Sequence, residues 1–177
     1  AAAHKHVPWM EGIVEVAFTN IVIGTRNVVE AALNYSVDRL VMISTDKAIR
    51  PSSVMGATKR LAELLVLDAA QRSGRAYSVV RFGNVLGSRG SVIPFFKKMS
   101  ATGEIPITDP RMTRFLITLE QGVDFVLRCL GAMKGGEIFV PKLPTITIPD
   151  LAEAVAPGCR QKVVGIRPGE KLHEAMV

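Results

Sequence analysis

Helical and strand patterns alternate along the first half of this sequence. Residues 18–35 repeat apolar side chains at steps of three and four, which places them on one face of a helix. The apolar run 39–43 is typical of a buried parallel strand. A second helical pattern covers 55–73 and ends at Gly74, and a further strand pattern covers 76–82. This alternation predicts an α/β fold with a parallel sheet.

Glycine and proline interrupt the chain more often beyond residue 83, so we expect a boundary there and a smaller lobe after it. Within this part, Thr118 and Gln121 form a capping box that predicts the start of an amphipathic helix. A strand is expected over 137–140. A short helix is expected from Thr147, because a proline and an acidic cap follow in its first turn.

The composition is that of a globular domain. Of the 177 residues, 48% are hydrophobic and 21% are charged, and no run of 18 apolar residues occurs. The net charge is +6, but Lys and Arg are spread along the chain and aromatic residues make up only 6%, which does not favour a nucleic-acid surface. A polyanionic small molecule such as a nucleoside diphosphate fits this charge equally well.

Cysteine and histidine give no pattern of a metal site or a disulfide framework. Cys129 and Cys159 have no second thiol near them in the sequence, and His4 and His6 have no third ligand nearby. The start of the chain also lacks a signal-peptide pattern. We therefore expect a protein of the reducing cytoplasm, without a metal and without a membrane span in this chain.

Polar residues follow directly on the strand predicted over 39–43. Ser44, Thr45, Asp46 and Lys47 come at its carboxyl end, where open α/β sheets bind their ligands. Two interpretations are open for Asp46 and Lys47. They form an acid–base pair in a site, or they form an exposed turn pair of little energetic weight.

Five short motifs occur in an order and spacing that match a known family. They are 44–48 (STDKA), 55–59 (MGATK), 81–88 (RFGNVLGS), 113–115 (TRF) and 167–172 (RPGEKL). In these motifs the chain resembles the UDP-N-acetylglucosamine 4,6-dehydratases, which are extended short-chain dehydrogenase/reductases. The resemblance runs along nearly the whole chain. It implies a partial Rossmann-type doubly wound parallel sheet, with its N-terminal half missing, and a smaller C-terminal substrate-binding lobe.

The resemblance also implies a division of the chain. Residues 1–83 would form the C-terminal half of a dinucleotide-binding domain, and residues 84–177 would form mainly the nucleotide-sugar lobe. The sequence contains no G-x-G-x-x-G after a strand, the turn that holds the pyrophosphate in this fold. A partial gene, a disordered first part and a natural fragment with a partner are the competing explanations, and the first is favoured. We expect the 177 residues alone to be inactive and to bind the cofactor weakly.

The family reaction implies roles for individual residues. A nicotinamide cofactor, NAD or NADP, removes hydride from C4 of the sugar, water is eliminated across C5 and C6, and the hydride returns to C6. By similarity Thr45 holds O4, Asp46 protonates the leaving hydroxyl and Lys47 takes the C5 proton. Lys59 would hold the nicotinamide ribose. Met55 stands where the wider superfamily has a tyrosine base, and it either lines the sugar pocket of a subgroup or is a core side chain.

Further residues are expected to hold ligands by family likeness. The cofactor set is Ala2, Ala3, Asn20, Ser44, Lys59, Arg81, Phe82, Gly83 and Val85. The substrate set is Lys5, Asn84, Arg114, Arg167 and Glu170. Arginine suits a diphosphate because its guanidinium forms a fork of hydrogen bonds to phosphate oxygens. The alternative interpretation of Arg114 and Arg167 is that of solvated surface groups. The expected partners are UDP-N-acetylglucosamine or a related UDP-sugar, and further copies of the full-length protein, but no nucleic acid.

Three functions are open on this sequence. The first is a 4,6-dehydratase of surface-glycan synthesis, and the second is a UDP-sugar 4-epimerase, which returns hydride to C4 and needs no acid and base at C5 and C6. Lys47 favours the first. The third is a non-catalytic module for nucleotide-sugar binding or association. The segments 90–96 and 165–173 resemble enzymes that invert C5, whereas Met55 resembles those that retain it, so the stereochemistry stays open.

Overall fold

The main sheet is parallel, as the alternating pattern predicts. The structure, a computed structural model, describes residues 4–177. The sheet has the order β1-β2-β6, with β1 at Arg39–Thr45, β2 at Ala76–Phe82 and β6 at Ile138–Phe139, and both pairings are parallel. The strands are connected through helices, because parallel neighbours need a crossover. The predicted α/β class is therefore confirmed.

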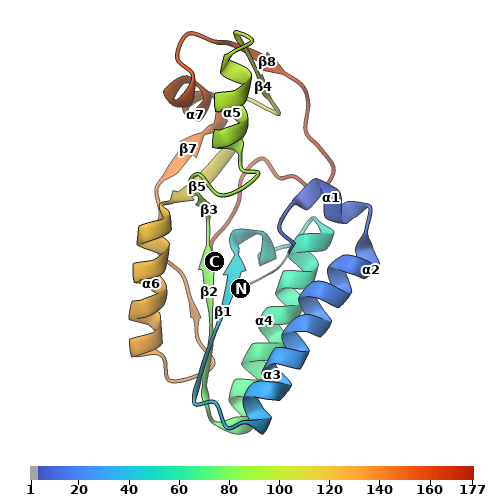
Figure 1. Cartoon of the computed structure of the whole chain (residues 1–177), viewed down its shortest axis with the longest axis vertical. Coiled ribbons are helices and arrows are strands. Elements are labelled where there is room, and N and C mark those ends of the chain that lie inside the picture. Colours follow the sequence, from blue (N-terminus) through green and yellow to red (C-terminus); the bar gives the residue numbers. More distant parts are fainter. Residues whose placement is uncertain (1–3) are drawn as a thin grey trace.

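Helices cover both faces of this sheet (Figure 1). α3 (Gly24–Asn34) and α4 (Val54–Ser73) lie on one face, and α6 (Leu119–Ala132) lies on the other. The Ser53 hydroxyl caps the first turn of α4, and Gly74 ends the helix in the left-handed conformation. Small and aliphatic side chains fill the core between α3, α4 and the strands around one tyrosine: Val29, Ala32, Ala62, Val66, Ala69, Tyr77 and Val79. Among residues 4–177 no helix combines the length and the apolar character needed to cross a bilayer.

The helix predicted over 18–35 is not uniform. Two short helices, α1 (Val7–Glu11) and α2 (Val14–Ala17), lead into a π-helical segment, η1 (Phe18–Ile23), and only then does α3 begin. The adjacent residues Ile21 and Val22 are both buried in η1. A regular period of 3.6 residues does not predict this local widening, so one helix was predicted over 18–35 where the structure has two segments in succession, η1 and α3.

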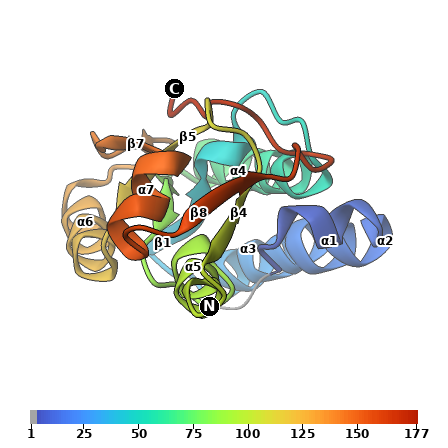
Figure 2. The ribbon, with the colours of Figure 1, turned by 90° about the horizontal axis from the view of Figure 1, so that it is seen from above.

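The second lobe lies above the main sheet in Figure 1 and faces the viewer in Figure 2, and it has its own small core. Its strands are β3 (Asn84–Val85), β4 (Glu104–Ile107), β5 (Thr113–Ile117), β7 (Thr145–Thr147) and β8 (Arg160–Val163), which form sheets of order β3-β5-β7 and β4-β8. α5 (Val92–Ser100) and α7 (Ile148–Val155) pack against them around Phe96 and Ile105. Residues 119–139 follow the predicted boundary but return to the main sheet as α6 and β6.

The start of α4 lies directly against the segment that follows β1. A Cβ atom at Gly56 would collide with the carbonyl oxygen of Lys47 and would lie 3.1 Å from Cβ of Pro51. Glycine is therefore the residue that permits this approach, which fixes the backbone of Lys47 against the helix.

Glu137 closes the loop between α6 and β6. Its carboxylate accepts hydrogen bonds from Ser78 Oγ at 2.5 Å and from the backbone N–H groups of Lys134 and Gly135 at 2.8 Å each. Burial by itself would raise the pKa of Glu137, but these hydrogen bonds outweigh it and lower the pKa to about 2. The ionised carboxylate thus joins the loop to β2.

Gly56→Ala should lower the free energy of unfolding by about 1–3 kcal/mol, because the added methyl group overpacks the contact with Lys47. Gly131→Ala on α6 is the matched control, since a Cβ there meets nothing within 4 Å and alanine favours a helix over glycine. Chemical denaturation compares the two variants. Equal stabilities would contradict the close approach.

Glu137→Gln should destabilise the protein by about 1–3 kcal/mol at pH 7, because hydrogen bonds to a charged group are lost. The folded-state pKa lies below the ordinary value of 4.5, so the contribution of the carboxylate is complete above pH 4.5 and disappears as the pH falls toward 2. Urea titrations at successive pH values should show the gap between variant and parent closing over this window. A gap independent of pH would exclude the carboxylate charge as its source.

Candidate active site

The chain turns sharply at the carboxyl end of β1. Thr45 caps a single 3-10 turn, η2 (Asp46–Ala48), and its hydroxyl accepts from the backbone N–H of Lys47. Asp46 is fully buried, and its Oδ1 accepts from the Thr45 hydroxyl at 2.8 Å and from Lys47 Nζ at 2.9 Å. Asp46 Oδ2 is also buried and has no hydrogen-bond partner among residues 4–177. The alternative of an exposed turn pair is therefore wrong, because the carboxylate lies inside the protein with one oxygen uncommitted.

Asn84 reaches this pair from the second lobe. Lys47 Nζ donates a hydrogen bond to Asn84 Oδ1 at 3.1 Å. Asn84 follows Gly83, where a Cβ atom would lie 2.7 Å from the carbonyl oxygen of Phe115 on β5. The missing side chain lets the chain cross from β2 to β3 in contact with β5, and so brings Asn84 to the end of β1. The structure therefore joins four predicted site residues, Thr45, Asp46, Lys47 and Asn84, in one hydrogen-bonded group.

A second carboxylate, Glu174, lies beside Lys47. Glu174 Oε1 is 3.8 Å from Lys47 Nζ, and Glu174 Oε2 is 3.7 Å from Lys171 Nζ. Sequence reasoning missed Glu174, because it lies 127 positions from Lys47 and no periodic pattern connects the two. Its signal in the sequence is its place two residues after the 167–172 motif.

Lys59 and Met55 differ in their surroundings although both lie in the first two turns of α4. Lys59 Nζ donates to the carbonyl oxygen of Ile43 at 3.2 Å, next to the turn. Burial lowers the pKa of the Lys59 ammonium, and the nearby charge of Glu63 only partly offsets this. Met55 is 4% exposed and belongs to the main core. This burial favours the interpretation of Met55 as a core side chain over a pocket-lining role.

Ser44 and Arg81, predicted to hold the cofactor, bind the buried carboxylate of Glu63. Ser44 Oγ and Arg81 Nε donate to Glu63 Oε1 at 2.6 and 2.9 Å, and Arg81 Nη2 and Arg60 Nη1 donate to Oε2 at 2.8 and 2.9 Å. Burial would raise the pKa of Glu63, but the hydrogen bonds of Arg81, Ser44 and Arg60 lower it. Glu63 was not predicted, because a single acidic residue among apolar helix positions reads as a solvated side chain.

The two predicted diphosphate arginines have different environments. Arg114 is buried, and its Nη1 donates to the carbonyl oxygens of Thr113 at 2.7 Å and Leu172 at 3.1 Å. Arg167 is exposed, and its Nη2 donates to Glu170 Oε1 at 2.7 Å. The structure thus pairs two predicted substrate residues, Arg167 and Glu170, with each other. Within residues 4–177, neither Arg167 nor Glu170 forms a hydrogen bond or an ion pair with the Asp46 turn.

The N-terminal residues lie along the edge of the second lobe. Lys5 Nζ donates to Ser88 Oγ at 3.1 Å, and burial lowers the pKa of Lys5. Asn20 Oδ1 accepts from the backbone N–H of His4 at 3.2 Å. The predicted cofactor residues Ala2 and Ala3 lie outside the described residues. In the part of the chain from residue 4 onward, no group of three or more His, Cys, Asp or Glu side chains could hold a metal ion.

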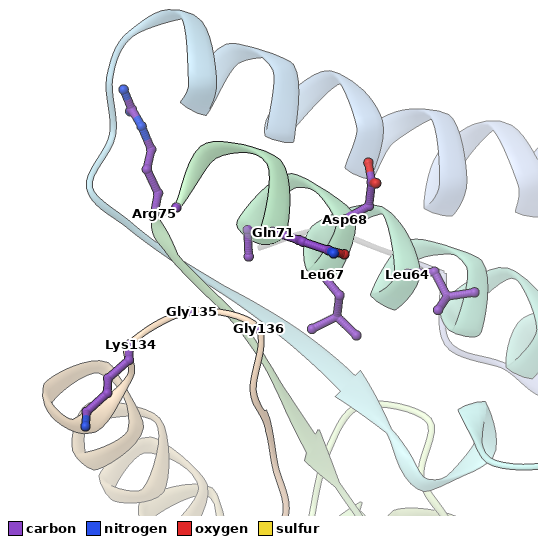
Figure 3. Close-up of a pocket in the computed structure, with 10 residues that line it drawn as sticks. Leu64, Leu67, Asp68, Gln71, Arg75, Lys134, Gly135 and Gly136 are labelled. Atoms are coloured by element: carbon purple, nitrogen blue, oxygen red, sulfur yellow. The ribbon is translucent and has the colours of Figure 1, made fainter.

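Two cavities lie at opposite ends of the main sheet. One of about 640 Å³ lies at the amino ends of the strands, between the end of α4 and the Gly135–Gly136 loop (Figure 3). There Arg75 is engaged with the Val37 carbonyl, and the sticks in Figure 3 show Arg75 and Lys134 directed away from each other. Because its polar groups do not converge, this cavity is a weak candidate for a site.

The other cavity, of about 390 Å³, is wholly apolar and lies between α6 and the carboxyl ends of β1 and β2. Its lining includes two predicted cofactor residues, Phe82 and Val85, together with Ile43 and residues of α6: Leu119, Gly122, Val123, Val126 and Leu127. Ile43 connects the two features of this end of the sheet, because its side chain lines the cavity and its carbonyl accepts from Lys59.

The chain is similar in sequence to nucleotide-sugar dehydratases and epimerases. The chain is 51% identical over 183 residues to a UDP-N-acetylglucosamine 4,6-dehydratase (inverting) of Campylobacter jejuni, an alignment that covers 100% of this chain and 54% of that protein. It is also 42% identical over 185 residues to a UDP-glucose 4-epimerase of Rickettsia akari, again over 100% of this chain and 54% of the relative. The chain thus spans about half the length of the curated relatives it matches.

Solved structures share the fold. Pen from Bacillus thuringiensis matches with a TM-score of 0.94 at 37% identity, over 99% of this chain and 58% of that one. DesIV from Streptomyces venezuelae, a dTDP-glucose 4,6-dehydratase with NAD bound, matches with a TM-score of 0.91 at 21% identity, over 100% of this chain and 63% of that one. These matches confirm the expected Rossmann-type fold. The family model described as polysaccharide biosynthesis protein matches residues 1–177, so the chain belongs to the polysaccharide biosynthesis protein family.

Proposed function

We propose that the protein carrying this chain is a nucleotide-sugar 4,6-dehydratase that acts on UDP-N-acetylglucosamine in surface-glycan biosynthesis. One observation carries the proposal. The buried carboxylate of Asp46, whose Oδ2 has no hydrogen-bond partner within residues 4–177, is hydrogen-bonded to the amine of Lys47 at the carboxyl end of a parallel strand. The named activity of the Campylobacter relative supports it. Elimination of water needs both a proton acceptor and a proton donor, and this turn supplies both.

Lys47 would act as the base toward C5 of the sugar. A neutral amine has two N–H bonds and one lone pair. The hydrogen bonds to Asp46 Oδ1 and Asn84 Oδ1 use the two N–H bonds, which leaves the lone pair to accept the C5 proton. Two fixed acceptors thereby direct the lone pair of the amine.

Asp46 would act as the acid toward the hydroxyl on C6. Its Oδ1 is occupied by Thr45 and Lys47, so Oδ2 is the oxygen that can carry a proton. As the C5–H bond breaks, its electron pair forms the C5–C6 double bond, the C6–O bond breaks, and the proton of Oδ2 converts the leaving oxygen to water. The proton from C5 ends on Lys47 and the proton of Asp46 leaves in the water, so a proton must pass from Lys47 to Asp46 before the next turnover.

The residues of this chain fit one side of a nicotinamide cofactor. When bound, NAD or NADP supplies oxidation at C4 and the return of hydride at C6. Lys59, whose pKa burial lowers, would hold the ribose hydroxyls near the end of β1. The apolar cavity beside Phe82 and Val85 would take the flat ring, and Thr45 would hold O4 of the sugar. Met55 has no proton to exchange and serves the core.

Arg167 and Glu170 are the proposed grip on the sugar diphosphate. The Arg167 guanidinium is exposed, and among residues 4–177 it pairs only with Glu170, so it is able to exchange Glu170 for phosphate oxygens. Glu170 would then accept from the ribose hydroxyls of the uridine. Arg114, Asn84 and Lys5 complete the proposed substrate set, and the acting form is proposed to be a homo-oligomer of the whole protein.

A UDP-sugar 4-epimerase is the second candidate, and the Rickettsia relative is the observation that favours it. An epimerase returns hydride to C4 and does not break the C5–H bond. The epimerase reaction therefore needs no base beside C5 and no acid beside C6. For this reason the Asp46–Lys47 pair favours the dehydratase.

Lys47→Ala in the protein that carries this chain should reduce dehydration of UDP-N-acetylglucosamine by about 100-fold or more, because the C5 base is lost. Formation of the 4-keto-6-deoxy product measures the rate. Lys98→Ala, at an exposed position on α5, is the control and should leave it unchanged. Steady 4-epimer formation that survives Lys47→Ala would favour the epimerase instead.

Asp46→Asn should separate the two proton transfers. The amide cannot protonate the leaving hydroxyl, so elimination should fall by about 100-fold or more, whereas Lys47 can still exchange the C5 proton with solvent. In heavy water, the recovered UDP-N-acetylglucosamine should carry deuterium at C5, as measured by mass spectrometry. Full elimination activity in this variant would remove Asp46 from the role of acid.

A further inference from the structure

The C-terminal segment 171–176 folds back onto the turn that carries Asp46 and Lys47. Arg114 Nη1 donates to the carbonyl oxygen of Leu172 at 3.1 Å, which fixes the segment to β5. Lys171 Nζ donates to the carbonyl oxygen of Ile49 at 2.7 Å, one residue beyond η2. Glu174 of this segment lies 3.8 Å from Lys47, in the turn at the carboxyl end of β1. The segment is thus attached to both lobes where they meet.

Glu174 is the buried charge of this segment. Its side chain is 3% exposed and lies between two ammonium groups, with Lys47 Nζ at 3.8 Å and Lys171 Nζ at 3.7 Å. Its Oε2 has no hydrogen-bond partner among residues 4–177. A carboxylate buried with few hydrogen bonds is unfavourable unless opposite charges remain beside it. The local energetics of Glu174 therefore depend on the charge state of Lys47.

We propose that Glu174 is a positioning residue for Lys47, an inference that rests on the function proposed above. Lys47 faces Asp46 on its own turn, Asn84 on β3 and Glu174 on the C-terminal segment. The first two direct the amine. The carboxylate of Glu174 stabilises the ammonium that forms when Lys47 takes the C5 proton, because opposite charges this close attract strongly away from bulk water.

Lys171 sets the strength of this effect. It is the second cation beside Glu174, and it divides the attraction of the carboxylate between two ammonium groups. Lys171 also lies next to Glu170 in the loop proposed to grip the diphosphate. The residues proposed to bind the diphosphate and the carboxylate beside Lys47 therefore lie in one continuous segment, 167–174.

Charge variants of the protein that carries this chain test the proposal through the pH profile of elimination. Glu174→Gln keeps the shape and removes the charge, so the acidic limb of kcat against pH should move down by about one pH unit, and the plateau of kcat should fall about tenfold with KM within about threefold. Lys171→Met removes the competing cation, so the limb should move to higher pH. Glu174→Asp retains the charge and should keep the limb within about 0.3 units of the parent.

Glu104→Gln is the matched control, because Glu104 also pairs with a lysine, Lys162 at 3.2 Å, but on the β4-β8 sheet. Its profile should equal that of the parent. If the parent is active and the acidic limb of kcat does not move in Glu174→Gln or in Lys171→Met, the positioning role is wrong. The proposed dehydratase function is not affected by that result. If Glu174→Gln does not fold, Lys171→Met decides alone, with an upward shift in support and no shift against. A parent that does not dehydrate UDP-N-acetylglucosamine overturns the proposed function itself.

Discussion

The buried carboxylate of Glu63 holds the carboxyl end of the main sheet together. Its two oxygens accept four hydrogen bonds, from Ser44 on β1, Arg81 on β2 and Arg60 on α4. Removing one partner of such a pair leaves an unpaired buried charge, which costs about 3–5 kcal/mol. The relative positions of two strands and a helix are therefore specified at one point. Thr45 and Asp46 directly follow Ser44, which donates to Glu63. The ion pair of Glu63 with Arg81 therefore helps to fix the position of the candidate site.

Much of the fold follows from local rules that the sequence displays. The Gly74 end of α4 and the Thr118–Gln121 capping box each satisfy backbone groups within a few residues, so short patterns predict them and the structure confirms them. The π-helical η1 and the return of residues 119–139 to the main sheet depend on packing between distant segments. Periodicity carries no information on such packing, and these features were not predicted.

The same distinction applies to the candidate site. Asp46, Lys47 and Asn84 were predicted because two of them end a strand and the third lies in a recognisable motif, and the structure brings them together. Glu63 and Glu174 were missed, since each acts through partners that are distant in sequence or on another element. Arg114 stays a proposed substrate residue, but the hydrogen bond from its buried guanidinium to the Leu172 carbonyl was not predicted, because only the path of the C-terminal segment determines it.

Gly83 is the single residue between β2 and β3, and it separates two sheets that each supply part of the candidate site. Side chains alternate between the two faces of an extended chain, so the orientation of Asn84 is set by the number of residues in this junction. The length of this junction therefore determines which face of β3 the side chain of Asn84 occupies. One residue more or fewer would turn the amide of Asn84 to the opposite face. The chain would still form both sheets, but Lys47 would lose its hydrogen bond to Asn84. Contact between Lys47 and Asn84 thus depends on the length of the Gly83 junction as much as on the residue types around it.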